Sequence, residues 1–311
     1  MIAATRRRAL TLAGGGAGLL LARGALAQAA AGIRLRPAAR VIVDNDFAGN
    51  PDGLIALAHQ VLSPTTIVPL VTCSPLDPQL AGPLAGRSAA EAARLVGEML
   101  PLADLPSDPQ VVAGAEGFGG GEGPSLAARA IVAEALRDDP LPLIVTCGGP
   151  LTNVAAALRL EPAIAARMTL IWIGGGGAGE PEYNQRVDEG AARFVLEETA
   201  VPLWQVPQPA YRQLQFGMAE MEAAFRPLSP LTRWLYDRYT TLPDWVQLGG
   251  ALAMGDTPMV LLSAIGGDSS TWREVPAGPA GRTIRLYDRL DARLALADML
   301  ARFRLHAERS R

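Results

Sequence analysis

The stretch RVIVDNDFAGNPDG, residues 40–53, decides the fold and raises the question of function. It starts as an apolar, β-branched run typical of a buried strand and ends among three acids, Asp44, Asp46 and Asp52. Side chains two apart on an extended strand point to the same side, so Asp44 and Asp46 are expected to be neighbours of like charge. The stretch therefore predicts a strand whose carboxyl end needs protons or a cation to offset that repulsion.

A hard divalent cation is one way to neutralise this acidic cluster. Ca²⁺ takes about six to eight oxygen ligands and accepts mixed carboxylate, carbonyl and water ligands more readily than Mg²⁺ does. Asp52 opens the next predicted helix, where the positive end of the helix dipole also favours an acid. The alternative is a purely structural one, in which Asp52 is an N-cap and the acidic loop is solvated.

Short β-branched runs alternate with Ala-rich helical stretches along the chain. The predicted strands are residues 40–44, 66–73, 141–147, 168–175 and 201–207, and the predicted helices are residues 51–62, 86–100, 151–160 and 187–198. This order favours parallel strands with right-handed crossovers and helices on both faces, so the predicted fold is an open, doubly wound, mostly parallel α/β sheet, Rossmann-like in architecture. Ligands of such folds bind beyond the carboxyl ends of the strands, and we expect three oxygen-rich loops to meet there in one crevice.

Residues 209–245 interrupt the alternation. This stretch lacks β-rich runs and is predicted to be a helical insertion that covers the crevice. Its aromatic side chains are of a kind that contacts planar ligands, although helix core is the expected use for most of them. They are Trp234, Tyr236, Tyr239 and Trp245.

Length and charge limit the class of protein. With 311 residues, 49% of them apolar, the chain can form one large α/β domain, which we place at residues 35–308. All 28 basic residues are Arg, so a mechanism that needs a catalytic Lys is excluded. Removing residues 1–27 takes away four Arg and no acid, which changes the formal net charge from −3 to −7 and argues against nucleic acid as a partner.

The first 30 residues are typical of an export signal peptide. They combine the basic run TRRRAL at residues 5–10, a short Gly-rich apolar stretch and an Ala-x-Ala site at residues 25–27. The consecutive arginines resemble a twin-arginine signal, and the apolar stretch is too short for a comfortable membrane span of about 20 residues. A retained N-terminal anchor is the alternative. We expect a periplasmic protein with no stable membrane anchor.

The chain has only two Cys and two His. An oxidising compartment permits a bridge between Cys73 and Cys147, but two thiols at the ends of buried strands are more often separate small apolar side chains. His59 lies on an apolar helix and His306 in an Arg-rich tail, and both are interpreted as structural. A metal site of the Cys/His type is therefore not expected.

Four motifs occur in an order that resembles the nucleoside hydrolase family. The first, DNDFAGNPDG at residues 44–53, corresponds to that family's Asp-x-Asp-Pro-Gly-x-Asp-Asp motif, and the second, GGPLTNVAAALRLEP at 148–162, corresponds to its Gly-Pro-Leu-Thr-Asn segment. The third, EYNQRVDEGAARFVL at 182–196, corresponds to its Glu-Phe-Asn segment, and the fourth, MGDTPMVLL at 254–262, corresponds to its His-Asp-Pro segment. One such match is weak evidence, whereas the ordered set is specific. The resemblance implies a single-domain N-ribohydrolase that cleaves the N-glycosidic bond of nucleosides or related ribosides, with one bound Ca²⁺, and a homodimer or homotetramer.

The resemblance also implies residue roles, carried over position by position. The implied Ca²⁺ ligands are Asp46, Asp52, the backbone carbonyl of Gly148 and Asp256. Asp46 would also accept the proton of the attacking water while an oxocarbenium-like centre develops at the anomeric carbon. The implied holders of the ribose hydroxyls are Asn50, Glu182 and Asn184.

The chain departs from the family pattern at several points. The first loop has one extra residue and a Phe-Ala pair in place of Pro-Gly, so either Asn50 or Pro51 takes the place of a sugar-binding Asp. Gly255 stands where many members keep a His that protonates the leaving base. The family's Asn after its second strand has no clear counterpart in TCSPLDPQLAG, residues 72–82. These departures support Ca²⁺ binding better than ordinary nucleoside turnover.

Two other functions compete with the hydrolase. A haloacid-dehalogenase-type phosphatase also opens with a strand and Asp-x-Asp, but it needs Thr or Val where this chain has Ala48, and a later Lys. A non-catalytic periplasmic Ca²⁺-dependent riboside- or sugar-binding protein would keep the site without turnover, and the loss of the His acid favours it. The Gly-rich run at residues 174–180 lacks the Lys and Thr of a phosphate-binding loop and is interpreted as a flexible approach to Glu182 or as a plain turn.

Overall fold

The computed structural model describes residues 35–49, 51–119, 123–176, 182–241, 249–279 and 281–310. The chain divides into two compact units, Met1–Arg36 and Pro37–Arg311. Of the first unit only Leu35 and Arg36 are described, so the predicted export signal at residues 1–30 lies outside the described residues.

One eight-stranded sheet organises this unit, in the strand order β3-β2-β1-β4-β5-β6-β10-β9. Its strands are β1 (Ala39–Asn45), β2 (Thr66–Cys73), β3 (Gln110–Ala113), β4 (Leu143–Cys147), β5 (Met168–Ile173), β6 (Leu203–Val206), β9 (Thr271–Pro276) and β10 (Thr283–Arg289). Neighbouring strands are parallel except β9, which runs antiparallel to β10. The predicted open, mostly parallel α/β sheet is confirmed. The strand order reverses between β1 and β4, which is where such sheets bind ligands.

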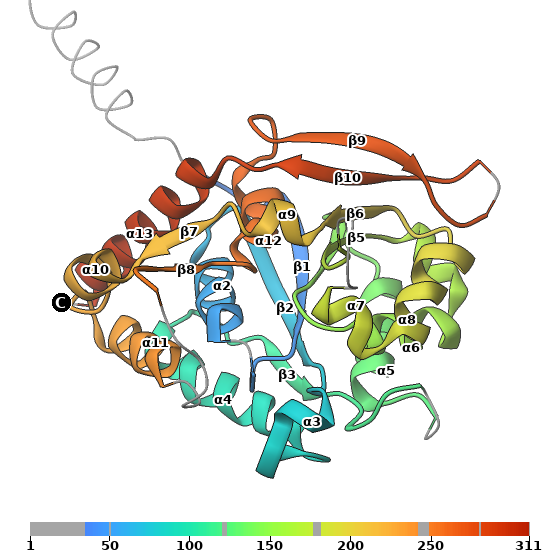
Figure 1. The fold of residues 1–311 in the computed structure, drawn as a ribbon, viewed down its shortest axis with the longest axis horizontal. Coiled ribbons are helices and arrows are strands. Elements are labelled where there is room, and N and C mark those ends of the chain that lie inside the picture. Colours follow the sequence, from blue (N-terminus) through green and yellow to red (C-terminus); the bar gives the residue numbers. More distant parts are fainter. Residues whose placement is uncertain are drawn as a thin grey trace, which may run out of the picture. The chain divides into compact units, whose positions relative to one another are not determined.

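Helices cover both faces of the sheet (Figure 1). They are α2 (Pro51–Leu62), α3 (Pro78–Ala81), α4 (Ser88–Ala103), α5 (Leu126–Leu136), α6 (Thr152–Leu160), α7 (Tyr183–Val187), α8 (Glu189–Arg193), α9 (Gln208–Tyr211), α10 (Met218–Glu220), α11 (Pro230–Thr240), α12 (Thr257–Val260) and α13 (Ala292–Arg309). Helices α2, α4, α11 and α13 pack into one apolar core, and α5, α6 and α8 into the other. Figure 1 shows the first group and the second group on opposite sides of β1.

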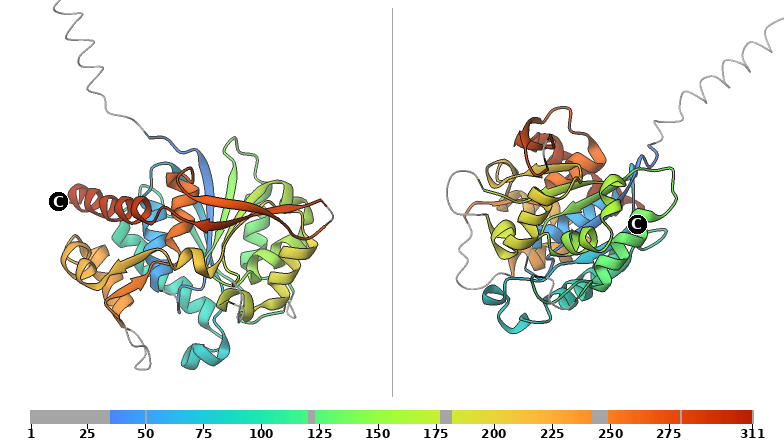
Figure 2. Two further views of the ribbon diagram at one scale, coloured as in Figure 1. Left: turned by 45° about the horizontal axis from the view of Figure 1, so that its top comes forward. Right: turned by 90° about the vertical axis from the view of Figure 1, so that its right-hand side faces the viewer.

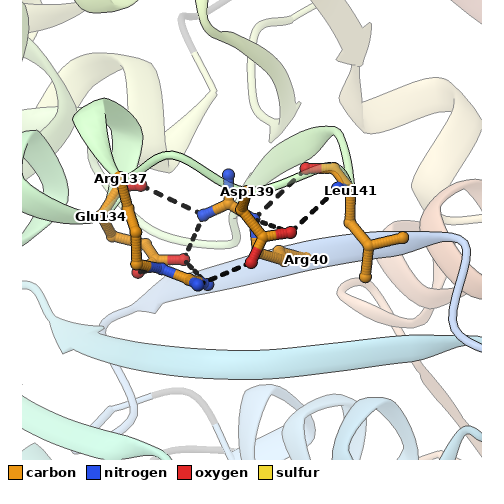
Figure 3. Close-up of polar contacts among 5 residues, drawn as sticks. All are labelled: Arg40, Glu134, Arg137, Asp139 and Leu141. Carbon is orange, nitrogen blue, oxygen red and sulfur yellow. Dashed lines mark hydrogen bonds and ion pairs between the residues drawn. The ribbon is translucent and has the colours of Figure 1, made fainter.

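Strand β1 is buried along its whole length, as expected for a central parallel strand covered on both faces. Its amino end is fixed by Arg40, which is 4% exposed and donates to the carbonyls of Glu134 (3.1 Å) and Leu141 (3.3 Å). The same guanidinium is paired with the carboxylates of Glu134 and Asp139 (Figure 3). A buried charge is tolerated only when it is paired and hydrogen-bonded in this way. This fixed end lies opposite the carboxyl end of β1, which carries the acidic residues.

The predicted helical insertion at residues 209–245 is helical for the most part, with α10 and α11 and a π-helical turn at Met221–Phe225. One part of the prediction is wrong, because β7 (Gln215–Gly217) is a strand that pairs antiparallel with β8 (Ala251–Ala253). A strand this short is stabilised by a partner distant in the sequence, which local composition does not reveal. Tyr239 is buried and donates to the Ala253 carbonyl, while Trp245 lies outside the described residues.

The expectations for the Cys and His side chains are confirmed. Cys73 and Cys147 are separate buried thiols. His59 contacts Asp298 through Nε2 (2.9 Å), and His306 contacts the Ala103 carbonyl (3.1 Å). The β9–β10 pair closes one edge of the sheet as a long hairpin (Figure 2). Across the part of the chain that is described, no helix has the length and apolar character needed to cross a bilayer.

Candidate active site

A cavity of about 1120 Å³ opens beyond the carboxyl ends of β1, β4 and β5. The residues that the sequence assigned to the site and that the structure describes all line it. They are Asp46, Asp52, Gly148, Glu182, Asn184 and Asp256. The expected meeting of three oxygen-rich loops in one crevice is thereby confirmed. Asn50, the other predicted sugar-binding residue, lies outside the described residues.

Asp46 directly follows β1 and is 2% exposed. Its backbone N–H donates to the side-chain oxygen of Asn45 (2.8 Å), while its own Oδ1 is buried without a hydrogen-bond partner in the described part of the chain. Burial raises the pKa of Asp46 to about 8, and the negative charges of Asp52, Asp44 and Glu182 add to the shift. A buried carboxyl oxygen without a donor is costly, and so this atom is suited to meet a ligand.

Asp52 and Asp256 both line the cavity and are in direct contact. Asp52 lies in the first turn of α2, and its Oδ2 accepts the backbone N–H of Asp256 (3.1 Å). Asp256 immediately precedes α12, and its Oδ2 accepts from Asn45 Nδ2 (2.8 Å). Burial raises the pKa of Asp52 to about 6 and that of Asp256 well above its ordinary value, with repulsion by Asp52 as the next cause for Asp256. Asn45 therefore links the loop after β1 to the loop before α12.

Gly148 follows β4 at the point of closest approach between the loops. A Cβ at this position would lie 2.4 Å from Asn45 Nδ2 and 2.8 Å from Asp256 Oδ1, so a side chain does not fit without displacement. The Gly148 carbonyl accepts from Asn184 Nδ2 (2.9 Å), which also donates to the Ile173 carbonyl (2.9 Å). The amide nitrogen of Asn184 is thus already used in the fold, and its oxygen is the atom left to meet a ligand.

Glu182 is the N-cap of α7 and is 4% exposed. Its Oε2 accepts from the backbone N–H groups of Gly175 (3.2 Å) and Gln185 (3.3 Å), and its Oε1 accepts from the Tyr211 hydroxyl (3.1 Å). Burial raises the pKa of Glu182, and these hydrogen bonds oppose that rise because they favour the ionised form. Glu182 is held from three sides at the edge of the cavity.

Asp44 does not join Asp46 in the cavity, contrary to the expectation that they are neighbours on one side of a strand. It is fully buried and accepts from Thr72 (2.6 Å), Ser74 (2.5 Å), Asn153 Nδ2 (2.9 Å) and the Cys147 thiol (3.5 Å). The strand alternation fails here because β1 ends at Asn45, and Asp46 lies in the turn beyond it. Asp44 therefore ties the ends of neighbouring strands together behind the site.

The donor set is chemically suited to a hard cation. As the side chains stand, no three His, Cys, Asp or Glu residues within the described ranges are grouped closely enough to hold a metal ion. The set nevertheless combines three buried carboxylates of raised pKa, one unpartnered carboxyl oxygen and one backbone carbonyl. Oxygen ligands of this kind are those that Ca²⁺ prefers, and a cation would offset the repulsion that raises the pKa values.

Two residues of the site were not singled out from the sequence. Asn45 stands between two acids, so its position in DND was a usable signal for a polar bridge. Tyr211 is brought to the cavity by α9, directly after β6, and no local sequence pattern distinguishes it from other aromatic residues of the insertion. The fold and the site together define an open α/β domain with an acidic ligand site at its switch point.

Comparison with known proteins identifies the family to which this α/β domain belongs. Residues 41–254 match the family described as inosine-uridine preferring nucleoside hydrolase, and the chain belongs to this family. Its members are hydrolases that act on N-glycosyl bonds.

Individual relatives support the same family. The pyrimidine-specific ribonucleoside hydrolase RihA of Salmonella arizonae is 30% identical over 116 residues, which are 34% of this chain and 37% of the relative. The match thus spans little more than a third of that curated relative. A solved inosine-guanosine nucleoside hydrolase has a TM-score of 0.67 at 17% identity, and the inosine-uridine preferring enzyme of Bacillus anthracis has 0.65 at 14%. Each alignment covers 86% of this chain and 99% of the other, and at these identities the likeness shows the fold.

Proposed function

We propose that this protein is a Ca²⁺-dependent N-ribohydrolase that cleaves nucleosides or related ribosides. The observation that carries the proposal is the convergence of Asp46, Asp52, Asp256 and the Gly148 carbonyl beside Glu182 in one cavity at the switch point of the sheet. Carboxylates and carbonyls suit a cation, and Glu182 together with the Asn184 oxygen suits sugar hydroxyls. The nucleoside hydrolase family gives this arrangement its reaction.

Asp46, Asp52, Asp256 and the Gly148 carbonyl are the groups that would hold Ca²⁺. When bound, the ion supplies positive charge that acidifies a nearby water and orients sugar hydroxyls. The same charge lowers the pKa values of the three carboxyls, which keeps them ionised at neutral pH. Asp46 is then a base with one oxygen not engaged by the protein.

The chain's own residues account for the proton transfer and the orientation of the sugar. Asp46 accepts the proton of the attacking water at its carboxylate, as general bases do when they lie within hydrogen-bonding reach. Glu182 is fixed through both oxygens and accepts a sugar hydroxyl without needing to reorient. The cavity wall at Gly255 offers no side chain to protonate the departing base. Substrates whose leaving group departs without protonation are therefore favoured.

A non-catalytic riboside-binding protein is the second candidate function. Gly255 favours it, because binding a riboside needs the ion site and the hydroxyl contacts but no acid for the leaving group. The two functions differ in turnover alone. They are separated by comparing calorimetric affinity with product release for the same ribosides.

The experiment that tests the hydrolase proposal is the release of reducing ribose from a panel of ribosides, with and without a chelator. Purine, pyrimidine and nitrophenyl ribosides should form the panel, because they differ in how much their leaving group needs protonation. Release that stops on chelation and returns with Ca²⁺ supports the proposal. Tight riboside binding with no release from any substrate supports the binding protein instead.

We further propose that the protein is exported to the periplasm by the twin-arginine route. The proposal rests on the sequence of residues 1–30. Substitution of Gln for all three consecutive arginines at residues 6–8 should leave folded protein in the cytoplasm. Mature protein beginning near residue 28 in the periplasm of that variant would contradict export by this route. Assembly as a homodimer or homotetramer stays a prediction.

A further inference from the structure

Tyr211 lies at the carboxyl end of α9 and lines the cavity on the side of Glu182. Its hydroxyl donates to Glu182 Oε1 over 3.1 Å. The backbone N–H groups of Gly175 and Gln185 donate to the other oxygen, Oε2, and the backbone N–H of Asn184 also bonds this carboxylate. Tyr211 is the side chain that donates to Oε1, and it therefore helps to fix the orientation of that oxygen.

The ring of Tyr211 also covers Gly255. A Cβ built on Gly255 would lie 3.4 Å from Tyr211 Cδ2 and 3.7 Å from its Cε2, with Asp52 Oδ2 also at 3.4 Å. These distances leave space for a methyl group but not for a long side chain, unless the ring moves. A large residue at position 255 and the ring of Tyr211 therefore compete for the same part of the cavity wall. Tyr211 occupies this part of the wall in the present chain.

The hydroxyl of Tyr211 is suited to donate a hydrogen bond and poorly suited to release its proton. Burial, and next the charge of Glu182, raise the pKa of Tyr211 well above its ordinary value. The tyrosine thus stays protonated at neutral pH and keeps donating to Glu182. A hydrogen bond to a charged acceptor is stronger than one between neutral groups, and at 3.1 Å this one orients Glu182 Oε1.

We propose that Tyr211 is a positioning residue that holds Glu182 Oε1 toward one hydroxyl of the bound sugar, and so sets the preference of the site for that hydroxyl. The inference rests on the proposed function, since it assigns Glu182 to the sugar. It concerns sugar recognition and not the ion or the proton transfer. The predicted signature is therefore confined to one hydroxyl of the sugar, whereas a general structural role would affect every substrate.

The test compares Tyr211→Phe with the wild type on nitrophenyl riboside and its 2-, 3- and 5-deoxy analogues. Affinity and kcat/KM are measured for each. Loss of a hydrogen bond to a charged group typically costs about tenfold or more, and we expect about tenfold for the parent riboside. The loss should be seen as an increase in KM with a smaller change in kcat. It should persist for two deoxy analogues and vanish for the one that lacks the hydroxyl accepted by Glu182.

Two further variants make the result specific. Tyr236→Phe is the matched control, because Tyr236 also bonds a glutamate, Glu222, but is not among the residues lining the cavity. It should leave all four substrates unchanged. In a Glu182→Gln background, which weakens the acceptor, Tyr211→Phe should add little further loss, because both substitutions act on the same contact.

The outcomes separate this inference from the proposed function. A Tyr211→Phe protein that melts like the wild type but loses the same factor on all four substrates, or loses nothing on the parent, overturns the inference while the hydrolase proposal stands. If the wild type binds ribosides without cleaving them, the affinities alone decide the inference. If the wild type neither binds nor cleaves any riboside, both proposals are wrong.

Discussion

Removal of divalent ions should make the stability of the protein fall steeply as the pH rises from 5 to 8. The reason is Asp46, whose pKa is raised by burial from its ordinary 3.8 to about 8 in the metal-free fold. A carboxyl whose pKa is higher in the folded state keeps its proton there while the unfolded chain releases it. Its favourable contribution is therefore present at low pH and is lost as the pH rises between these two values.

The size of this loss of stability follows from the pH range over which Asp46 is protonated only in the folded state. Each pH unit over which only the folded state is protonated is worth about 1.4 kcal/mol, so pH 5 to 8 corresponds to a loss of about 4 kcal/mol from Asp46. Asp52, with its pKa raised to about 6, contributes in the same direction over the lower part of the range. A loss of this size is a large fraction of the stability of an ordinary domain, which is about 5–15 kcal/mol.

Urea unfolding followed by circular dichroism at pH 5, 6, 7 and 8 in chelator measures this loss. Asp46→Asn is the control, because an amide of the same shape does not titrate, and its stability should fall much less over the same range. Added Ca²⁺ should raise the stability of the wild type at pH 8 by about 2.7 kcal/mol when the free ion is at a hundred times its Kd, which recovers part of the loss. Equal urea midpoints at pH 5 and pH 8 for the chelated wild type, or the same pH slope in Asp46→Asn, would refute the reasoning.

Two other predictions follow from the same site. Asp256→Ala should yield protein with little bound Ca²⁺, and adding the ion should not raise its melting temperature, because one of the three carboxylates is lost. A metal analysis that finds the wild-type Ca²⁺ content in this variant would exclude Asp256 as a ligand. Nitrophenyl riboside should be hydrolysed at least about a hundredfold faster than inosine, because Gly255 cannot protonate a departing base and general acid catalysis contributes about a hundredfold or more. Equal kcat/KM values for the two substrates would point to an acid elsewhere in the cavity.

The central strands were predictable from the sequence because burial on both faces selects β-branched residues. Strands β1, β2, β4, β5 and β6 and the helices α2, α4, α6 and α8 were all expected from such runs and from Ala-rich periodicity. Strands β3, β9 and β10 were not. β3 has four residues, and β9 exposes most of its side chains at the edge of the sheet, so neither carries a strong apolar signal.

The positions of the site residues were predictable to the level of the loops, but their contacts were not. Strand ends and ordered motifs bring Asp46, Gly148 and Glu182 to one edge of the sheet. The use of the Asn184 amide to bind the Gly148 carbonyl depends on how two loops pack, which no single motif encodes. The same holds for Tyr211, which reaches Glu182 from an element that begins after β6.

The alternation of side chains along a strand did not predict the position of Asp44 relative to Asp46. Alternation along a strand predicts that residues two apart share a side, but the rule holds only while both residues stay in the strand. Because β1 ends at Asn45, Asp46 lies outside the strand, and it lines the cavity while Asp44 does not. Asp44 then acquires its own donors from β2, β4 and α6, and its burial needs no cation.

We propose that Asp46 is the base of a riboside hydrolase, and turnover and riboside affinity of Asp46→Asn in saturating Ca²⁺ test this role. The amide keeps an oxygen of similar position but cannot accept the proton of the attacking water. The account predicts that kcat falls by about a hundredfold to ten-thousandfold while riboside affinity falls much less. Wild-type turnover in the variant would contradict the assignment of Asp46. A wild-type protein that binds Ca²⁺ and ribosides but releases no ribose from any of them would contradict the enzyme itself.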